Sequence, residues 1–107
     1  MSQVLQLTEV LDKRARLGRP YTEFLRVPAM SAGLYVLAAG ATDTQKPHGE
    51  DEIYYVISGR ARIRIGEEER PIRDGDLIFV EAAREHRFLG IEQELTLLVV
   101  FAPAEGS

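Results

Sequence analysis

Residues 53–65 read IYYVISGRARIRI, and this stretch decides the fold class of the 107-residue chain. The residues Ile53–Ile57 are all β-branched or aromatic, which favours a strand that ends at the turn signal Ser58-Gly59. Arg60–Ile65 then alternates strictly between arginine and an apolar residue. Side chains on a strand point alternately to its two faces, so this alternation predicts a strand with one buried face and one face covered by arginine.

Similar strand-like runs lie on both sides of this stretch. They cover residues 21–27, 33–39, 77–80, 85–89 and 95–101. Together with the two central strands they predict about seven or eight short strands, separated by turns about every eight to twelve residues. Such a pattern is typical of an all-β sandwich or barrel.

One short helix is predicted before the strands, over residues 8–16. Thr8 can cap its N-terminus, and Gly18 followed by Pro20 marks its end. Its expected buried stripe consists of Leu7, Val10, Leu11 and Leu17.

The composition excludes several classes of protein. The 17 acidic and 13 basic residues give a formal net charge of −4, which disfavours a nucleic-acid binder because phosphate neutralisation supplies most of that affinity. The lack of cysteine excludes disulfides, thiolate zinc sites and thiol nucleophiles. No apolar stretch is long enough to predict a membrane span, and residues 1–12 do not resemble a signal peptide. We therefore expect a cytoplasmic protein with no membrane partner.

The chain has only two histidines, His48 and His86, and acidic residues lie near both. Glu52 is the fourth residue after His48. Two imidazoles and one carboxylate could form a facial triad on a divalent first-row metal and leave positions open for other ligands. A single histidine is more often a surface or hydrogen-bonded residue, however, and an acidic run is more often a solvated loop. The residue types alone leave these alternatives open.

The intervals between residues 40 and 59 are more specific than the residue types. Gly40 is followed by Lys46 after five intervening residues, His48 after one, Glu52 after three and Gly59 after six. These intervals resemble the first motif of the cupin family, G-x5-H-x-H-x3,4-E-x6-G. Lys46 stands where that motif has its first histidine.

A second set of intervals resembles the second cupin motif, G-x5-P-x-G-x2-H-x3-N. It begins at Gly75 and keeps its histidine as His86. Glu81, Ala83 and Gly90 replace the usual proline, glycine and asparagine. The two motifs are separated by a short linker that is typical of small bacterial cupins. Two motifs that match in interval and in order are much more specific than either alone.

The resemblance implies an all-β fold, the cupin double-stranded β-helix or jelly-roll barrel, with a short N-terminal helix. We expect one domain over residues 1–107, in which residues 33–102 form the barrel. Residues 1–32 would form a helix and strand segment before it, and residues 103–107 a loose tail. Small cupins commonly pair through their outer strands and N-terminal segment, so the resemblance also implies a homodimer.

Carried over position by position, the resemblance implies that His48, Glu52 and His86 are metal ligands. The ion would be divalent zinc, iron, nickel, manganese or copper. Lys46 is a poor ligand because an ammonium group offers no lone pair. It could instead contact a charged substrate, or it could face outward. Gln45 could offer a fourth oxygen if the strand carries a bulge, and a pocket without metal remains the alternative.

Tyr54 shares a strand face with Glu52, because the two are separated by one residue. It could line the pocket or donate a proton there, or it could be a core aromatic residue with a satisfied hydroxyl. The predicted function is a small metal-binding cupin that acts as an enzyme on a small organic substrate, of dioxygenase, isomerase or lyase type. The alternative is a non-catalytic barrel that binds a small molecule or sugar. The fold does not choose between them.

Overall fold

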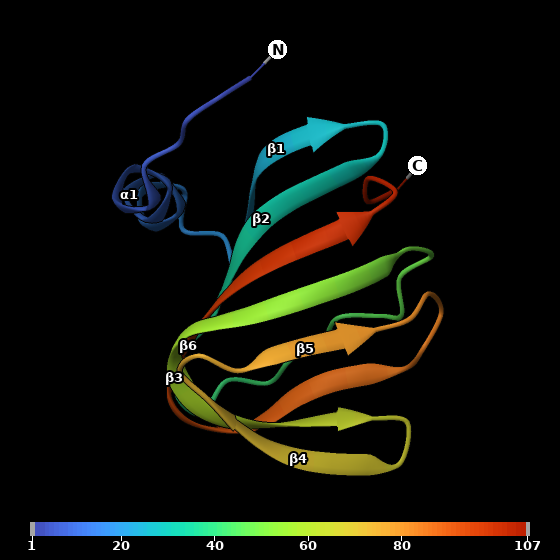
Figure 1. Cartoon of the computed structure of the whole chain (residues 1–107). Helices are drawn as coiled ribbons and strands as arrows, with labels where there is room; N and C mark the ends of the chain where they lie inside the picture. The colour runs from blue at the N-terminus through green and yellow to red at the C-terminus, as the bar shows by residue number, and fades with distance from the viewer. Residues whose placement is uncertain (1, 107) are drawn as a thin grey trace.

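The strands form one antiparallel sheet that curls strongly around its own apolar face (Figure 1). The computed structural model describes residues 2–106. Within these residues the elements are α1 (Leu7–Leu17), β1 (Tyr21–Val27), β2 (Met30–Leu37), β3 (Asp51–Ile65), β4 (Glu68–Arg73), β5 (Leu77–Val80) and β6 (His86–Ala102). The strand order is β1-β2-β6-β3-β4, and β5 pairs with β3. The predicted all-β jelly-roll fold with one short helix is confirmed. No helix among residues 2–106 is long and apolar enough to cross a membrane.

The two longest strands, β3 and β6, join the two layers of the barrel. Their pairing changes register several times between Val56 and Arg62, and the strands bend there. Before the bend, β3 lies between β6 and β5, and β6 continues the layer to β2 and β1. After the bend, β3 pairs with β4 on its other side. One strand therefore serves both layers.

This bend corrects the prediction of a turn at Ser58-Gly59, because β3 runs through both residues. Gly59 has a φ of 117°, and a Cβ atom there would lie 2.4 Å from the Glu94 carbonyl oxygen. Glycine thus lets β6 pass close to the bend. The predicted strands at 85–89 and 95–101 are likewise parts of one strand, β6.

The prediction missed β4, whose sequence EERPIR shows no apolar alternation. Gly66 and Glu67 form the turn, and the strand begins at Glu68. Only Ile72 is buried in β4. An edge strand of this kind leaves little pattern in the sequence, because one side chain alone packs inward.

The core lies between the two layers and is lined by alternate residues of β3. The buried positions of β3 include Tyr54 and Val56 before the bend and Ala61 and Ile63 after it. The buried phase thus changes from even to odd numbers across the bulged region, as an inserted residue requires. The arginines of the alternating run face solvent, as predicted.

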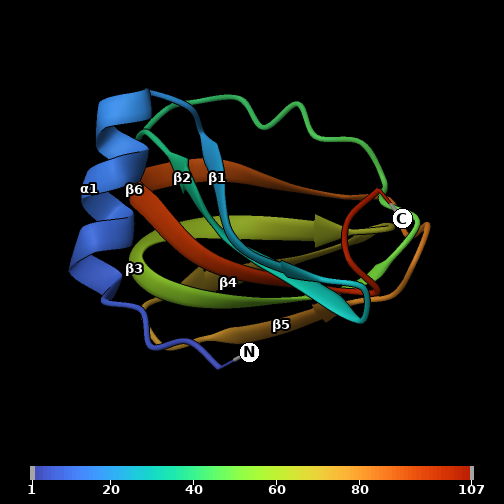
Figure 2. The same cartoon turned by 90° about the horizontal axis from the view of Figure 1, so that it is seen from above.

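The helix α1 lies outside the sheet at one end (Figure 2). It ends as predicted, with Gly18 in the left-handed region and its N–H donating to the Arg14 carbonyl. Its start differs, because Gln6 occupies the cap position and Thr8 lies inside the helix. The predicted apolar stripe is only partly buried: Val10 is buried, whereas Leu7 is 47% exposed.

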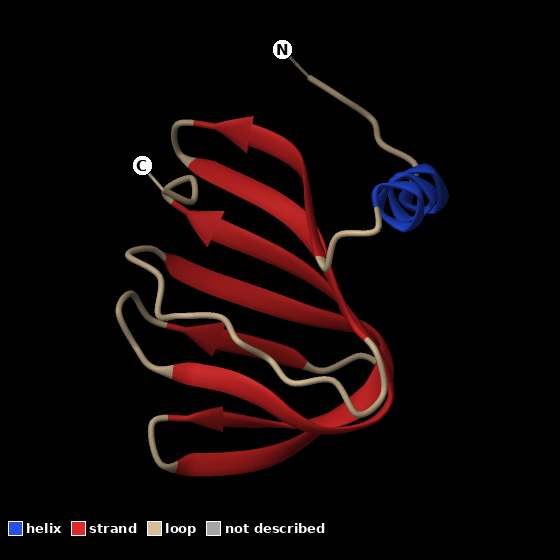
Figure 3. Cartoon of the chain, turned by 180° about the vertical axis from the view of Figure 1, so that it is seen from behind, coloured by secondary structure: helices blue, strands red, loops and turns tan. Residues whose placement is uncertain are grey.

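The connection between β2 and β3, residues 38–50, runs from the helix end of the sheet to the opposite end (Figures 2 and 3). The C-terminal segment reaches the same opposite end (Figure 2). Both segments contribute side chains to the site described below.

Candidate metal centre

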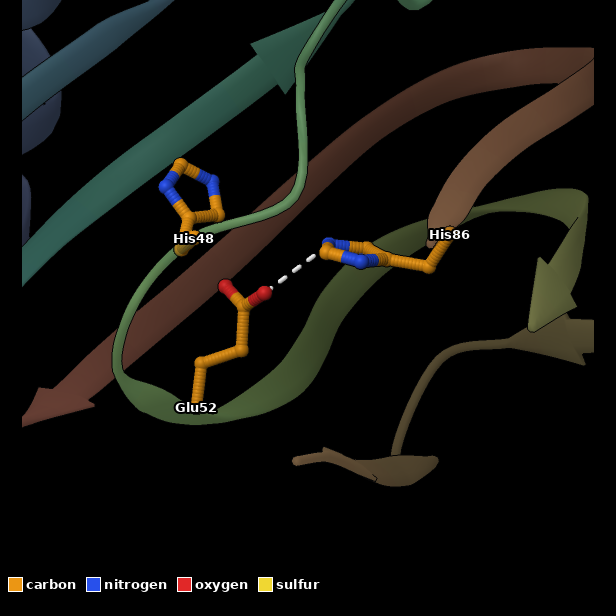
Figure 4. Close-up of side chains that lie close together, drawn as sticks. All are labelled: His48, Glu52 and His86. Atoms are coloured by element: carbon orange, nitrogen blue, oxygen red, sulfur yellow. Dashed lines mark ion pairs between the residues drawn. The ribbon is translucent and has the colours of Figure 1, made fainter. Parts of the chain in front are cut away.

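Three residues that are far apart in the sequence converge inside the barrel (Figure 4). His48 lies near the end of the β2–β3 connection, Glu52 on β3, and His86 at the first position of β6. Each offers one ligand atom, and these atoms all lie within 4.8 Å of one another. The structure thus brings the three predicted ligands to a common point.

Glu52 and His86 form a buried pair at the centre of this cluster. Glu52 Oε1 lies 2.8 Å from His86 Nε2, and both side chains are 1% exposed. His86 Nδ1 lies 2.8 Å from the Arg84 carbonyl oxygen, which can only accept, so Nδ1 carries a proton. In a neutral imidazole, Nε2 would then direct a lone pair at the carboxylate. A proton or a metal cation must therefore lie between the two atoms.

The pKa of His86 reflects the same arrangement. Burial alone would lower this pKa, because it disfavours the charged imidazolium. The hydrogen bond to Glu52, the Arg84 carbonyl and the nearby carboxylate charges oppose burial and raise the pKa above its ordinary value. The site therefore favours positive charge at this position.

The donor set fits a divalent first-row metal. Glu52 Oε2 is buried and has no hydrogen-bond partner within residues 2–106. A buried carboxylate oxygen without a partner is costly unless a cation or another donor satisfies it. Two imidazole nitrogens and a carboxylate oxygen are ligands that zinc, iron, nickel, manganese or copper accept. Glu52, His48 and His86 would hold the ion.

Gln45 faces this cluster, held by a buried carboxylate that the sequence analysis did not single out. Its Nε2 donates to Asp43 Oδ2 at 2.9 Å, which turns its Oε1 toward the site. That oxygen lies 3.3 Å from His48 Nε2 and 3.3 Å from the Tyr54 hydroxyl. Gln45 lies in the β2–β3 connection and not on the bulged strand that was expected, but its Oε1 still faces the cluster.

Asp43 is 2% exposed, and its carboxylate accepts four hydrogen bonds. Its donors are the Tyr35 hydroxyl at 2.7 Å, the Phe88 N–H at 2.9 Å, and the backbone and side chain of Gln45. The carboxylate therefore ties the β2–β3 connection to β2 and β6. Asp43 lies between Thr42 and Thr44, and this polar context does not indicate that its side chain is buried. Only the fold shows its role.

Lys46 is exposed and does not line the cavity beside the cluster. The Lys46 side chain is in contact with solvent, which agrees with the interpretation in which it faces outward. The neighbouring residue, Gln45, points inward instead.

Tyr54 combines both of the interpretations left open for it. It is 1% exposed, and its ring packs edge-on against Phe88 with centroids 5.0 Å apart. Its hydroxyl lies 3.0 Å from His86 Nε2. Burial and, after it, the charge and hydrogen bond of Glu52 raise the pKa of Tyr54 far above its ordinary value, so the hydroxyl keeps its proton.

A cavity of about 130 Å³ opens beside the cluster. Its walls are formed by Tyr21, Tyr35, Gln45, His48, Tyr54, Val99, Phe101 and Glu105. Within the part of the chain that the structure describes, no lysine or arginine lines it. A cavity of about 150 Å³ can bind benzene, so the space suits a ligand of about that size.

Glu105 is the only acid among the described residues of the cavity wall, and it comes from the segment that was predicted to be a loose tail. Within the described part of that segment, Ala104 is 2% exposed and Gly106 donates to Glu50 Oε2. Glu105 Oε2 lies 3.3 Å from His48 Nδ1. Burial raises the pKa of Glu105, whereas His48 acts to lower it. The small and polar residues of this segment gave no indication in the sequence that its backbone is held by hydrogen bonds.

These features define a jelly-roll barrel with a candidate metal centre in its interior. A model of the cupin domain matches residues 33–101, so the chain belongs to the cupin family. An uncharacterized protein of Streptomyces coelicolor is 45% identical over 103 residues, which cover 96% of this chain and 98% of that protein.

Solved structures share the fold at lower sequence identity. An RmlC-like cupin from Shewanella frigidimarina is 19% identical, with a TM-score of 0.72 over 78% of this chain and 75% of that one. The DMSP lyase DddQ from Ruegeria pomeroyi is 18% identical, with a TM-score of 0.69 over 82% of this chain and 49% of that one. At these identities the likeness extends to the fold alone.

Proposed function

We propose that this cupin is a metal-dependent enzyme that acts on a small organic substrate. His48, Glu52 and His86 would hold a divalent metal in the barrel. The observation that carries the proposal is the buried Glu52–His86 pair, whose carboxylate keeps one oxygen without a partner. A structural pair would satisfy both oxygens with hydrogen bonds.

The cavity supports a small substrate. Tyrosine and phenylalanine form half of its wall, and within residues 2–106 the wall has one acid and no lysine or arginine. The Tyr54 hydroxyl and the Gln45 amide oxygen supply one donor and one acceptor near the candidate ligands. They would orient a polar substrate group, while Phe101 and Tyr21 would exclude bulk water. A bound divalent metal would supply Lewis-acid or redox chemistry there.

A non-catalytic function as a small-molecule or sugar receptor is the second candidate. Lys46 in place of the first motif histidine favours it, because the site then has one imidazole fewer than the family motif. Hydroxyl and amide groups of the cavity wall also suit the hydroxyl groups of a sugar. Turnover of a substrate by the metal-loaded protein distinguishes the enzyme from the receptor.

Metal content tests the ligand assignment. We expect wild-type protein, purified without chelator, to contain close to one equivalent of a divalent metal by elemental analysis. His86→Ala should contain almost none, because it removes one of three ligands. His48→Ala, at a position that is more exposed, provides a second variant if the first does not fold. Equal metal content in the wild type and both variants would refute the assignment.

We also propose that the protein is a homodimer that pairs through the outer face of β3 and β5. Ile53 lies opposite Phe79 and Tyr55 opposite Leu77 in this strand pair. All four side chains are large, apolar and at least 39% exposed, so they form a continuous apolar strip. A monomer rarely leaves such a strip uncovered, and a second copy would cover it with an identical strip.

Light scattering during size-exclusion chromatography tests the dimer. The wild type should elute at twice the monomer mass, and Phe79→Glu should elute as a monomer. The variant should keep the metal content of the wild type, because Phe79 faces away from the barrel interior. A monomeric wild-type protein would contradict the proposal.

A further inference from the structure

We infer that Glu105 is a positioning residue that fixes the His48 imidazole from outside the ligand cluster. The inference rests on the proposed function, since its purpose is to present one ring nitrogen to a metal. It also makes the C-terminal segment a working part of the site. Residues beyond 101 lie outside the matched cupin domain, so the family motifs do not include this contact.

The segment that carries Glu105 is fixed at its backbone. The Glu105 N–H donates to Ser31 Oγ at 2.9 Å, and the Glu105 carbonyl accepts from the Arg26 guanidinium at 2.7 Å. The next N–H, from Gly106, donates to Glu50 Oε2 at 3.1 Å. These bonds tie the segment to β1, β2 and the β2–β3 connection. The Glu105 side chain is thereby held over the ring of His48.

The contact between the two side chains determines where the ring keeps its proton. An ionised carboxylate only accepts hydrogen bonds and carries a full negative charge, so Glu105 Oε2, 3.3 Å from Nδ1, attracts the ring proton of His48 to Nδ1 more strongly than the neutral amide oxygen of Gln45 attracts it to Nε2. In the neutral ring, Nε2 then bears the lone pair. Histidine ligands are commonly oriented in this way by a carboxylate or carbonyl group on their second nitrogen.

The nitrogen that remains faces the cluster. His48 Nε2 lies 3.3 Å from Gln45 Oε1, which lies 3.3 Å from the Tyr54 hydroxyl. That hydroxyl lies 3.0 Å from His86 Nε2, the atom that meets Glu52. A chain of polar contacts therefore connects His48 Nε2 to the buried pair. Nδ1 is directed away from this chain, toward the C-terminal segment.

In both histidines an oxygen atom lies next to Nδ1, but the two oxygens come from different groups. At His86, the backbone carbonyl of Arg84 accepts from Nδ1 at 2.8 Å and leaves Nε2 for Glu52. At His48, the carboxylate of Glu105 takes the place of that carbonyl. His48 belongs to a connection outside the sheet and needs a partner from another segment. Apart from Glu105, its ring packs edge-on against Phe101, with centroids 4.9 Å apart.

Nitrogen-15 NMR of the metal-free protein tests the inference directly, because only two histidines contribute signals. At neutral pH the wild type should show a slowly exchanging Nδ1 proton on His48. Glu105→Ala should lose it. Glu105→Gln keeps the shape of the side chain but carries no charge to attract the proton to Nδ1, so its signal should weaken. Identical His48 signals in the wild type and both variants would overturn the inference.

Co²⁺ affinity, measured by competition with a chromophoric chelator, provides the second readout. Glu105→Ala should bind Co²⁺ about 10- to 100-fold more weakly than the wild type, the usual effect of removing a group that orients a ligand. Glu92→Ala is the matched control, since Glu92 pairs with Arg60 on the exposed surface. It should bind as the wild type does. Lower stability of Glu105→Ala with unchanged Co²⁺ affinity and unchanged His48 signals would show a merely structural role and overturn the inference.

The two measurements separate this inference from the proposed function. A wild-type protein that binds no divalent metal would refute the proposed metal centre. The NMR comparison would still decide whether Glu105 fixes the His48 ring, because it uses metal-free protein.

Discussion

The two sides of the metal centre are built in different ways. Glu52 and His86 belong to the long strands β3 and β6, and each side chain is 1% exposed. His48 belongs to the β2–β3 connection, is 20% exposed, and depends on Gln45 and on Glu105 for its contacts. The strand side supplies a buried charge that needs a cation. The connection side supplies a ligand that other segments must orient.

This difference assigns separate tasks to the two sides. Paired strands hold a side chain in place through many backbone hydrogen bonds, so the strand side can keep a costly buried carboxylate. The connection side contributes Gln45 and His48 to the cavity wall. Loss of a ligand on either side should weaken metal binding. Substitutions of the other residues that hold the connection should instead change stability or the orientation of His48.

Glu52→Gln tests the strand side and should have the largest effect. The amide keeps the size of the side chain and can donate to His86 Nε2, so the metal-free protein should fold. Sites with four protein ligands bind zinc with about 10–16 kcal/mol, so one lost ligand should cost about 4 kcal/mol, or about a thousandfold in affinity. Calorimetric titration with Zn²⁺ measures the change. Affinity within tenfold of the wild type would show that Glu52 is not a ligand.

Asp43→Ala tests the connection side through its buried anchor. The substitution leaves the Phe88 N–H and the Tyr35 hydroxyl without their acceptor. Unsatisfied buried donors cost about 1–3 kcal/mol each, so the free energy of unfolding should fall by about 3 kcal/mol. Urea denaturation of the metal-free protein measures this loss.

Asp51→Ala is the matched control for Asp43. Asp51 also accepts a backbone N–H, from Ala82, but at an exposed position where water can replace it. Its loss should cost less than about 1 kcal/mol. Equal destabilisation by the two substitutions would show that the buried network around Asp43 does not hold the connection.

The same difference explains how much of the molecule could be predicted from its sequence. The strand alternation in residues 60–65 and the motif intervals predicted the fold. The motif intervals also identified His48, Glu52 and His86 as candidate ligands of one metal. Local patterns record which face of a strand is buried, and motif intervals record family resemblance. Neither records a contact between a connection and a distant segment, so Asp43 and Glu105 were missed.

The bends were missed for a related reason. Gly59 was interpreted as the end of a strand, because glycine in a run of β-formers usually marks a turn. In the structure it allows a close approach of β6 to a strand that continues. Whether a glycine ends a strand or bends it depends on the partner strand, which lies about 35 residues further along the chain.

Lys46→Ala should have the smallest effect and sharpens the comparison most. The side chain is exposed and outside the cavity wall, so metal affinity measured by the same titration should equal that of the wild type. Lys46→His provides the paired variant, because it restores the histidine of the family motif. If the connection holds position 46 away from the cluster, Lys46→His should also bind metal as the wild type does. A gain in affinity for Lys46→His would show instead that the connection can turn this side chain inward, and that the orientation of this side of the centre is not fixed by Asp43 and Gln45.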